Sequence, residues 1–282
     1  MIFQNIIQSS LSEKDWRWFI HAMQNIDICF QENTFLENFA LVGRYFPSCC
    51  TCSQEELNSV SASLPYKIDF SYWKLDEIGR AEMLLALNKH GDLKNFIHRL
   101  YRYCDNKEQI AVLKSLALLP SPGQFLPVAL DAHRSNVLTV FSALACHNPF
   151  PANFMEEFHF NNLVLKAIFV GLSPLNIYEL QKRLNPNLSR IVEDWILERE
   201  AANRPIMPEV WGIVVPFATQ PILDKVYSYL GSPDPEHRYW SAFSLGKTKD
   251  KKHLPYLEKQ SWEEKEILVK NVILEAIKNF HQ

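Results

Sequence analysis

The chain has 282 residues and a net charge of −3, with 47% hydrophobic and 22% charged residues. A chain of this size can bury a sizeable core, and this one lacks the basic excess with which nucleic-acid binders neutralise phosphates. It contains 8 glycines against 16 prolines, which leaves little material for glycine-rich phosphate loops or tight hairpins. Composition therefore predicts a globular, helical protein.

The cysteine content and the N-terminal residues allow a prediction of the cell compartment. Six cysteines are present, of which Cys49, Cys50 and Cys52 are crowded together. No pair of Cys-x-x-Cys motifs completes a zinc site, and a chain of this length needs no disulfides, so reduced thiols are expected. The N-terminus has neither the basic start nor the long apolar run of a signal peptide, and no run approaches a membrane span. We expect a cytoplasmic protein without direct membrane insertion.

Apolar residues recur at helical spacing through the N-terminal third, which predicts a series of amphipathic helices. Ser12, with Asp15 three residues later, is typical of a helix N-terminus. Gly91 stands where a left-handed residue would end a helix. A polar segment over 47–64 interrupts the pattern. The predicted helices span 11–31, 32–45, a turn or two within 54–61, 74–91 and 92–103, with Asp105 or Asn106 capping the next.

Three later segments resemble one another, because each is an apolar helix followed by a proline. Proline lacks the amide hydrogen that would continue a helix, so each one marks a turn. The segments are 112–120, 140–149 and 165–174. Between and after them we expect second helices over 124–133, 152–158 and 175–184. Helix pairs repeated at this short period are typical of HEAT-like or armadillo-like stacks.

Beyond residue 188 the pattern continues less regularly, with prolines still bounding the predicted elements. A long helix is expected over 188–203 and a short, β-branched element over 208–216. The basic stretch 247–253 is typical of a solvent-exposed connection. The remaining helices are expected over 221–230, 234–245, 254–258 and 261–280.

No segment predicts a strand system, because the β-branched stretch is too short and bounded by prolines. The predicted fold class is all-α, an α–α superhelix of HEAT-like or armadillo-like helix pairs. We expect a single helical repeat domain over 1–282. Its parts are N-terminal helices and a polar loop over 1–64, a core region over 65–215 and C-terminal HEAT-like helices over 216–282.

Motifs of common catalytic sites are missing from the sequence, including G-x-S-x-G, the P-loop, H-E-x-x-H and G-x-G-x-x-G. The nine histidines are dispersed. His90 and His98 fall on different predicted helices and cannot form a simple i, i+4 metal pair. We therefore predict no catalytic residue, no metal and no cofactor.

Charged residues within apolar helices are the first candidate functional residues. Arg80 follows Asp76 at i, i+4 and Glu77 at i, i+3, so both carboxylates can meet its guanidinium on one face. A helix-surface ion pair is the simpler interpretation of this cluster, and a ligand-binding arginine is the alternative.

A second cluster combines Asp194, Glu198, Arg199 and Arg204. Asp194 and Glu198 share a helix face, where two like charges cost free energy unless a cation lies between them. Arg199 or Lys166 could supply that cation. The cluster is either an inter-helix salt bridge or a polar pocket that holds a ligand or a partner's charge.

Asn162 and Lys166 lie four residues apart on an apolar helix in the middle of the predicted stack. Helices of a curved stack present one face to a groove, so polar residues on that face are candidate ligand contacts. Alternatively, Asn161 caps this helix and Lys166 extends its ammonium to water. Most of the 18 Phe, 10 Tyr and 7 Trp should be core, and an aromatic-lined pocket for a flat metabolite is compatible with them.

A family resemblance rests on several of these segments and on Trp211. The segments are 73–80 (WKLDEIGR), 147–151 (HNPFP), 161–169 (NNLVLKAIF), 183–188 (RLNPNL) and 198–205 (EREAANRP). Together they resemble the EboA family over about 70–215. Where the family pattern has glycine, this chain has Asn203, and asparagine also tolerates the left-handed conformation.

The resemblance implies a role in moving or processing a secondary-metabolite precursor toward the cell envelope. It implies as partners a small metabolite, a prenyltransferase-like membrane protein and several co-encoded enzymes. The charge balance predicts no nucleic-acid partner. It supplies no catalytic residues. The candidate ligand- or partner-binding residues are Arg80, Asn162, Lys166, Asp194, Glu198, Arg199, Arg204 and Trp211.

Three functions remain open at this point. The first is a non-enzymatic helical-repeat protein that binds a metabolite or a pathway protein. The second is an enzyme acting on a prenylated or aromatic metabolite, which requires Asp194, Glu198 and Lys166 to converge in a pocket. The third is a HEAT-like nucleic-acid binder, which requires a basic groove.

Overall fold

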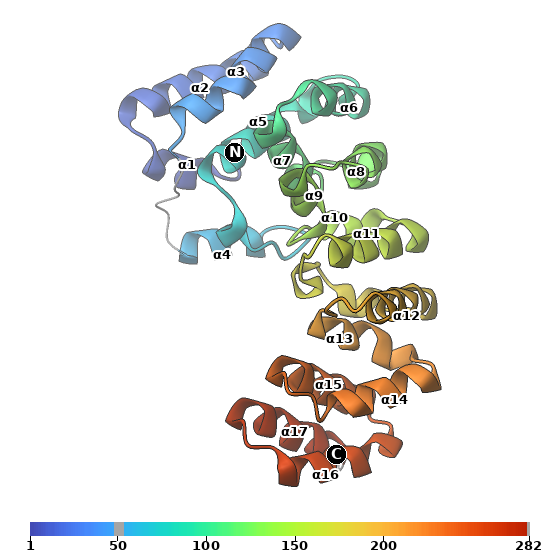
Figure 1. Ribbon diagram of the computed structural model, residues 1–282. Helices are drawn as coiled ribbons and strands as arrows, with labels where there is room; N and C mark the ends of the chain where they lie inside the picture. Colours follow the sequence, from blue (N-terminus) through green and yellow to red (C-terminus); the bar gives the residue numbers. More distant parts are fainter. Residues whose placement is uncertain (48–53, 281–282) are drawn as a thin grey trace. The chain divides into compact units, whose positions relative to one another are not determined.

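The structure, a computed structural model, describes residues 1–47 and 54–280, with no side chain for Gln54. Cys49, Cys50 and Cys52 lie outside the described residues. Within the described part the protein is all-helical, with 75% of residues in helices and no strands (Figure 1). The predicted all-α class is confirmed, while the HEAT-like or armadillo-like superhelix stays a prediction. No helix in the described ranges is long and apolar enough to cross a bilayer.

The chain divides into two compact units, and each is described by itself. The first consists of residues 1–160 and 176–178, and the second of 161–175 and 179–282. This division does not test the prediction that residues 1–282 form a single helical repeat domain. The first unit contains α1 Gln4–Ser10, α2 Glu13–Ile28, α3 Glu32–Tyr45, α4 Gln54–Ala62, η1 Phe70–Tyr72, α5 Leu75–Ala86, η2 Leu87–Lys89, α6 Leu93–Tyr103, α7 Asn106–Ser115, η3 Pro122–Phe125, α8 Leu126–His133, α9 Leu138–Ala145 and α10 Pro149–Phe154.

Helix α11, Glu157–Phe169, begins at the end of the first unit and continues into the second. The remaining elements follow it in chain order. They are η4 Pro174–Asn176, η5 Leu180–Arg183, α12 Pro186–Ala201, η6 Pro208–Val210, α13 Trp211–Val214, η7 Val215–Phe217, α14 Gln220–Tyr229, α15 Pro235–Thr248, η8 Lys251–His253, α16 Leu254–Glu263 and α17 Ile267–Asn279.

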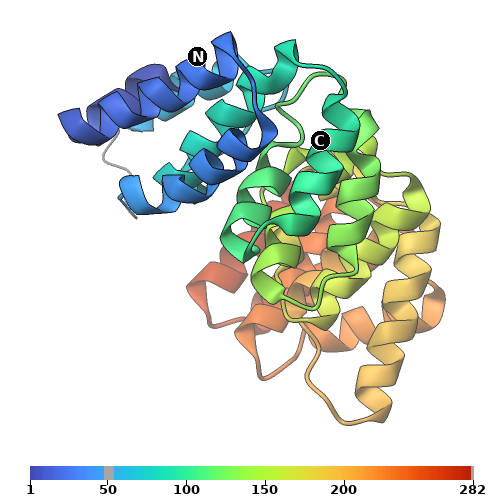
Figure 2. The same ribbon diagram turned by 90° about the horizontal axis from the view of Figure 1, so that it is seen from above.

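Helix α5 is the centre of the first unit and packs against α1, α2, α3 and α7, while α2 and α3 lie side by side (Figure 2). Most of its apolar residues are buried, and three charged residues on it are buried as well. Each of these has partners. Arg80 pairs with Asp76 at 2.7 Å, Glu77 with Lys114 at 2.6 Å, and Glu82 accepts the Phe3 N–H at 2.7 Å.

In the second unit α15 packs between α13 and α17, and α16 packs on α17. Gly246 permits the closest of these approaches, because a Cβ there would collide with Ala276 on α17. Trp211 is fully buried, and its indole donates to Nδ1 of His237 at 3.1 Å. The packing of these helices is thus stabilised by a close backbone contact and by a buried hydrogen bond.

Several predicted helix starts are confirmed by their capping bonds. The Ser12 hydroxyl accepts the Asp15 N–H at 3.2 Å, and Asp105 with Glu108 forms a reciprocal capping box on α7. Gly91 has a φ of +53°, as expected for the end of a helical segment. As predicted, the prolines at 120, 149 and 174 follow the ends of α7, α9 and α11; Pro149 begins α10 and Pro174 begins η4.

Two of the predicted second helices are wrong. Instead of a helix over 152–158, α10 starts earlier, because Asn148 caps it by accepting the Phe150 N–H at 2.9 Å and Pro149 occupies its first position. Instead of a helix over 175–184 there are two short 3-10 turns, since Glu179 has a left-handed φ of +49° that stops helix growth. The lysines of the stretch 247–253 are exposed as predicted, but His253 is buried and bonds the Tyr227 hydroxyl at 2.8 Å.

Candidate functional site

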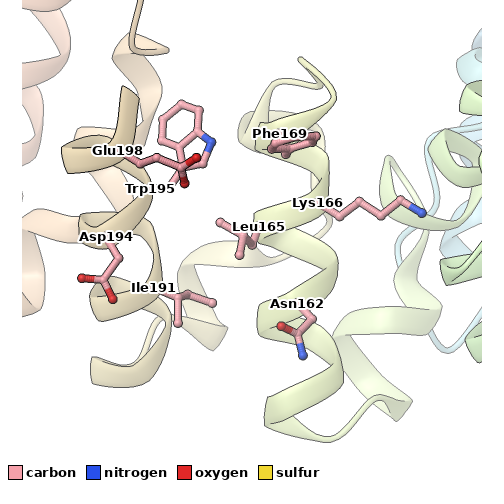
Figure 3. A pocket seen from close by; sticks show the side chains of 8 residues that line it. All are labelled: Asn162, Leu165, Lys166, Phe169, Ile191, Asp194, Trp195 and Glu198. Atoms are coloured by element: carbon pink, nitrogen blue, oxygen red, sulfur yellow. The ribbon is translucent and has the colours of Figure 1, made fainter. Parts of the chain in front are cut away.

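A groove of about 470 Å³ lies between α11 and α12 (Figure 3). Its volume falls in the range of roughly 300–1,000 Å³ that is typical of small-molecule sites. Each helix contributes four side chains at positions i, i+3, i+4 and i+7, which is the spacing of a single helix face. The lining residues are Asn162, Leu165, Lys166 and Phe169 on α11, and Ile191, Asp194, Trp195 and Glu198 on α12.

A pair of asparagines sets the position of α12 against α11. Asn161 and Asn185 exchange two amide hydrogen bonds of 3.1 and 3.0 Å. Asn185 is also the N-cap of α12 and accepts the Leu188 N–H at 2.9 Å. The interpretation that Asn161 caps its own helix is therefore wrong, because its side chain bonds the cap of the next helix instead.

The opposite side of α12 is held by buried polar contacts. The Ser189 hydroxyl donates to the Val214 carbonyl at 3.0 Å. The Glu193 carboxylate accepts both the backbone N–H and the hydroxyl of Thr219, at 2.9 and 3.1 Å. These contacts leave the face with Ile191, Trp195 and Glu198 turned to the groove.

The groove has an apolar wall in which Trp195 is the largest side chain. Trp195 is 8% exposed, and its Nε1 is shielded from water without a hydrogen-bond partner in the described part of the chain. Leu165 extends from α11 toward α12, and Phe169 stands at the upper end of the groove, 71% exposed. The wall therefore offers apolar surface and one unsatisfied donor.

The α12 side of the rim carries two carboxylates. Asp194 pairs with Arg190 of its own helix at 3.3 Å on the exposed surface. Glu198 is exposed and has no ion-pair partner among the described residues. Lys166 lines the groove, but its ammonium extends to the side of α11 away from α12 (Figure 3). Burial lowers the pKa of Lys166 below its ordinary value.

Arg199 contacts the Trp195 ring of the groove wall. Its guanidinium lies over the Trp195 ring at 5.4 Å and donates to the Pro205 carbonyl at 3.0 and 2.8 Å. Arg204 is exposed, and its backbone N–H bonds the Arg199 carbonyl at 2.8 Å. Between them Asn203 has a left-handed φ of +52°, which the chain uses to turn out of α12.

The predicted site residues thus fall into three groups. Asn162, Lys166, Asp194 and Glu198 line one groove, and Arg199 and Arg204 stand beside it. Trp211 is in the core of the second unit, fully buried and bonded to His237. Arg80 is in the core of the first unit, where Asp76 and the Phe39 carbonyl hold it at 2.7 and 3.1 Å.

Four apolar lining residues were not among the predicted site residues. They are Leu165, Phe169, Ile191 and Trp195. These four residues lie on the same helix faces as the predicted polar residues, at spacing i, i+3, i+4, i+7. This spacing could have indicated them, but it is also typical of any helix face that packs into a core.

The positions of the charged lining residues can be compared with what an enzyme or a nucleic-acid binder would require. The carboxylates of Asp194 and Glu198 and the ammonium of Lys166 do not converge on one point, because the Lys166 ammonium extends away from α12 (Figure 3). The lining carries two acidic residues and one basic residue, so it does not have the charge of a phosphate-binding surface.

The fold and the groove define an all-helical protein with a ligand-sized, apolar-walled and acid-rimmed site between two helices. The model of one family, metabolite traffic protein EboA, matches residues 1–215. The match covers most of the chain and every groove residue, so the chain belongs to the EboA family. The resemblance predicted from the sequence is confirmed. No curated protein and no solved structure matches the chain.

Proposed function

We propose that the protein serves metabolite traffic by binding a small molecule in the α11–α12 groove. The observation that carries this proposal is the indole N–H of Trp195, which is buried in the groove wall without a partner among the described residues. A buried donor left unpaired costs about 1–3 kcal/mol. A molecule that accepts this hydrogen bond would recover that cost on binding.

The lining narrows the chemistry of the ligand. Leu165, Ile191 and Trp195 favour a flat, apolar body, which aromatic rings supply. The Trp195 N–H calls for an acceptor such as a carbonyl oxygen. Asp194 and Glu198 at the rim favour a donor or cationic group at one end of the molecule. We therefore infer an aromatic metabolite with a carbonyl near its rings and an amine or similar donor at its outer end.

The groove supports binding rather than chemistry in this proposal. Lys166 points away from the two carboxylates, so the trio offers no acid–base pair aimed at one atom. The prenyltransferase-like membrane protein and the co-encoded enzymes implied by the family would deliver or receive the bound molecule.

The proposal is tested with glycine 2-naphthylamide, which combines two fused rings, an amide carbonyl and an ammonium. The readout is the indole N–H signal of Trp195 in a ¹H–¹⁵N spectrum, assigned with the variant Trp195→Phe, together with calorimetric titration. We expect saturable binding that moves this signal. N-acetyl-2-naphthylamine, which lacks only the ammonium, is expected to bind several-fold more weakly.

Two variants separate the groove from other sites. Glu198→Gln should remove most of the preference for the ammonium, whereas Glu258→Gln, an exposed glutamate on α16, should leave it unchanged. Binding that ignores both Trp195→Phe and Glu198→Gln would overturn the proposal. Absence of probe binding together with co-purification of a pathway enzyme would favour an adaptor function instead.

A further inference from the structure

A second cavity, of about 230 Å³, lies in the first unit and is separate from the α11–α12 groove. It is formed where the connection between α2 and α3 meets the turn from η2 into α6. A cavity of about 150 Å³ lined by apolar side chains is large enough to bind benzene, so this one has room for one or two fused rings. Its principal lining residues are Phe30, Glu32, His90, Gly91, Phe96 and Arg99.

The floor of the cavity is aromatic. Phe30 stacks on the His90 imidazole with ring centroids 5.1 Å apart and an interplanar angle of 21°. Phe96 meets Phe30 edge to face at 5.7 Å. Flat rings bind such a floor through offset stacking and edge contacts. An added Cβ on Gly91 would meet nothing within 4 Å, so the wall on that side borders open space.

His90 brings an unsatisfied polar atom to this floor. Its Nε2 is buried and has no hydrogen-bond partner among the described residues. Nearly all buried polar atoms are paired in folded proteins, so such an atom calls for an explanation. Because Nε2 is shielded from water, a bound molecule reaches it after a turn of the imidazole on Phe30, and side-chain rearrangements of this size are common on binding.

The charges on the rim restrict what can bind. Glu32 and Arg99 pair with each other at 3.1 Å. Asp92 adds a carboxylate, and the hydrogen bond from the Asn95 backbone N–H lowers its pKa. With Glu32 and Arg99 compensating each other, the rim keeps an excess negative charge, which disfavours an anionic ligand.

We propose that this cavity binds a neutral aromatic molecule with a ring hydroxyl, a phenol or a fused-ring phenol, whose hydroxyl bonds Nε2 of His90. A hydroxyl both donates and accepts, so it satisfies the imidazole in either tautomer. The aromatic floor holds the ring, and the acidic rim selects the neutral compound. This site is independent of the α11–α12 groove.

The proposal is tested on the full chain with 2-naphthol, naphthalene and 2-naphthoate by calorimetric titration. We expect 2-naphthol to bind about five- to tenfold more tightly than naphthalene, which lacks the hydroxyl. The anionic 2-naphthoate should bind more weakly than 2-naphthol. Equal affinity for 2-naphthol and naphthalene would overturn the proposal.

Two variants locate the effect. His90→Phe keeps a ring against Phe30 but removes Nε2, so it should abolish the preference for 2-naphthol while naphthalene still binds. Glu258→Gln, an exposed position on α16 in the other unit, should leave both affinities unchanged. His90→Gln, which keeps a hydrogen-bonding amide, should retain part of the preference and guards against a folding defect in His90→Phe. A preference that survives in both His90 variants would contradict the assignment.

Discussion

The guanidinium of Arg199 lies 5.4 Å from the centre of the Trp195 ring and is fixed by two hydrogen bonds to the Pro205 carbonyl. The contact joins the wall of the α11–α12 groove to the segment that follows α12. Trp195 thus has a fixed cation against its ring, and we expect the orientation of the indole N–H to depend on this contact.

Arg199→Lys tests the support directly. Lysine keeps the charge but loses the planar, two-pronged hydrogen bonding to Pro205. We expect the Trp195 indole signal to broaden or shift and the affinity for glycine 2-naphthylamide to fall about three- to tenfold, measured by titration. Arg190→Lys, on the exposed side of α12, is the matched control. Equal behaviour of the two variants would argue against a supporting role for Arg199.

Asn203 provides a test of the turn that ends α12. Its φ of +52° is left-handed, a conformation that glycine adopts freely and that costs other L-residues about 1–2 kcal/mol. Asn203→Gly should therefore leave the free energy of unfolding unchanged or slightly raised, whereas Asn203→Ala should lower it by about 1 kcal/mol. Urea unfolding of both variants gives the comparison, and an alanine variant as stable as the glycine variant would contradict it.

The lowered pKa of Glu264 predicts that the stability of the protein depends on pH. Burial alone would raise the pKa of Glu264, but hydrogen bonds from Arg238, the Glu266 backbone and Gln260 outweigh it and lower the pKa to about 2 from the ordinary 4.5. Arg238 donates to both carboxylate oxygens, at 2.8 and 3.0 Å. A depressed pKa stabilises the folded state above the unfolded pKa, and that contribution is lost as the pH falls from about 4.5 toward 2.

The measurement compares wild type with Glu264→Gln by urea unfolding at several pH values. We expect the wild type to be more stable at neutral pH, by on the order of 3 kcal/mol, and the difference to shrink below about pH 4.5. Glu258→Gln, exposed on α16, should show no such convergence. A difference between wild type and Glu264→Gln that stays constant down to pH 2.5 would contradict the assigned pKa.

Gly246 allows a test of how closely helices α15 and α17 pack against each other. A Cβ at Gly246 would collide with the Cβ and Cα of Ala276, and the backbone of α17 cannot move aside cheaply. Gly246→Ala should lower the free energy of unfolding by about 1–3 kcal/mol through overpacking. Gly212→Ala is the control, because the nearest atom to its Cβ would be Ser244 Oγ at 3.8 Å. Similar unfolding midpoints for the two variants would show that α15 and α17 are not closely packed.

Local signals in the sequence predicted much of the fold. Ser12 and Asp105 cap helices as expected, because capping depends on residues three positions apart. The repeat pattern predicts a helix over 175–184, but it gives no sign of the left-handed backbone of Glu179, a conformation that glutamate rarely adopts. Local sequence patterns therefore predict where helices form better than they predict the backbone conformations that interrupt a helix.

The candidate site was predicted only in part for a similar reason. Asn162, Lys166, Asp194 and Glu198 stood out as polar residues on apolar helices, and they do line one groove. Trp195 did not stand out, because an apolar residue at helical spacing usually packs in a core. Arg80 stood out for its charge and pairs with Asp76 as its spacing predicts, but its burial and its bond to the Phe39 carbonyl join distant segments that no local pattern reveals.

The most direct test of the central claim is the Trp195 indole N–H signal during titration with glycine 2-naphthylamide. If the α11–α12 groove is a metabolite site, this signal moves in a saturable manner as its proton gains an acceptor, and Glu198→Gln weakens the binding several-fold. If the signal stays in place while the probe binds elsewhere, or if no binding occurs at all, the groove is not the site of metabolite binding.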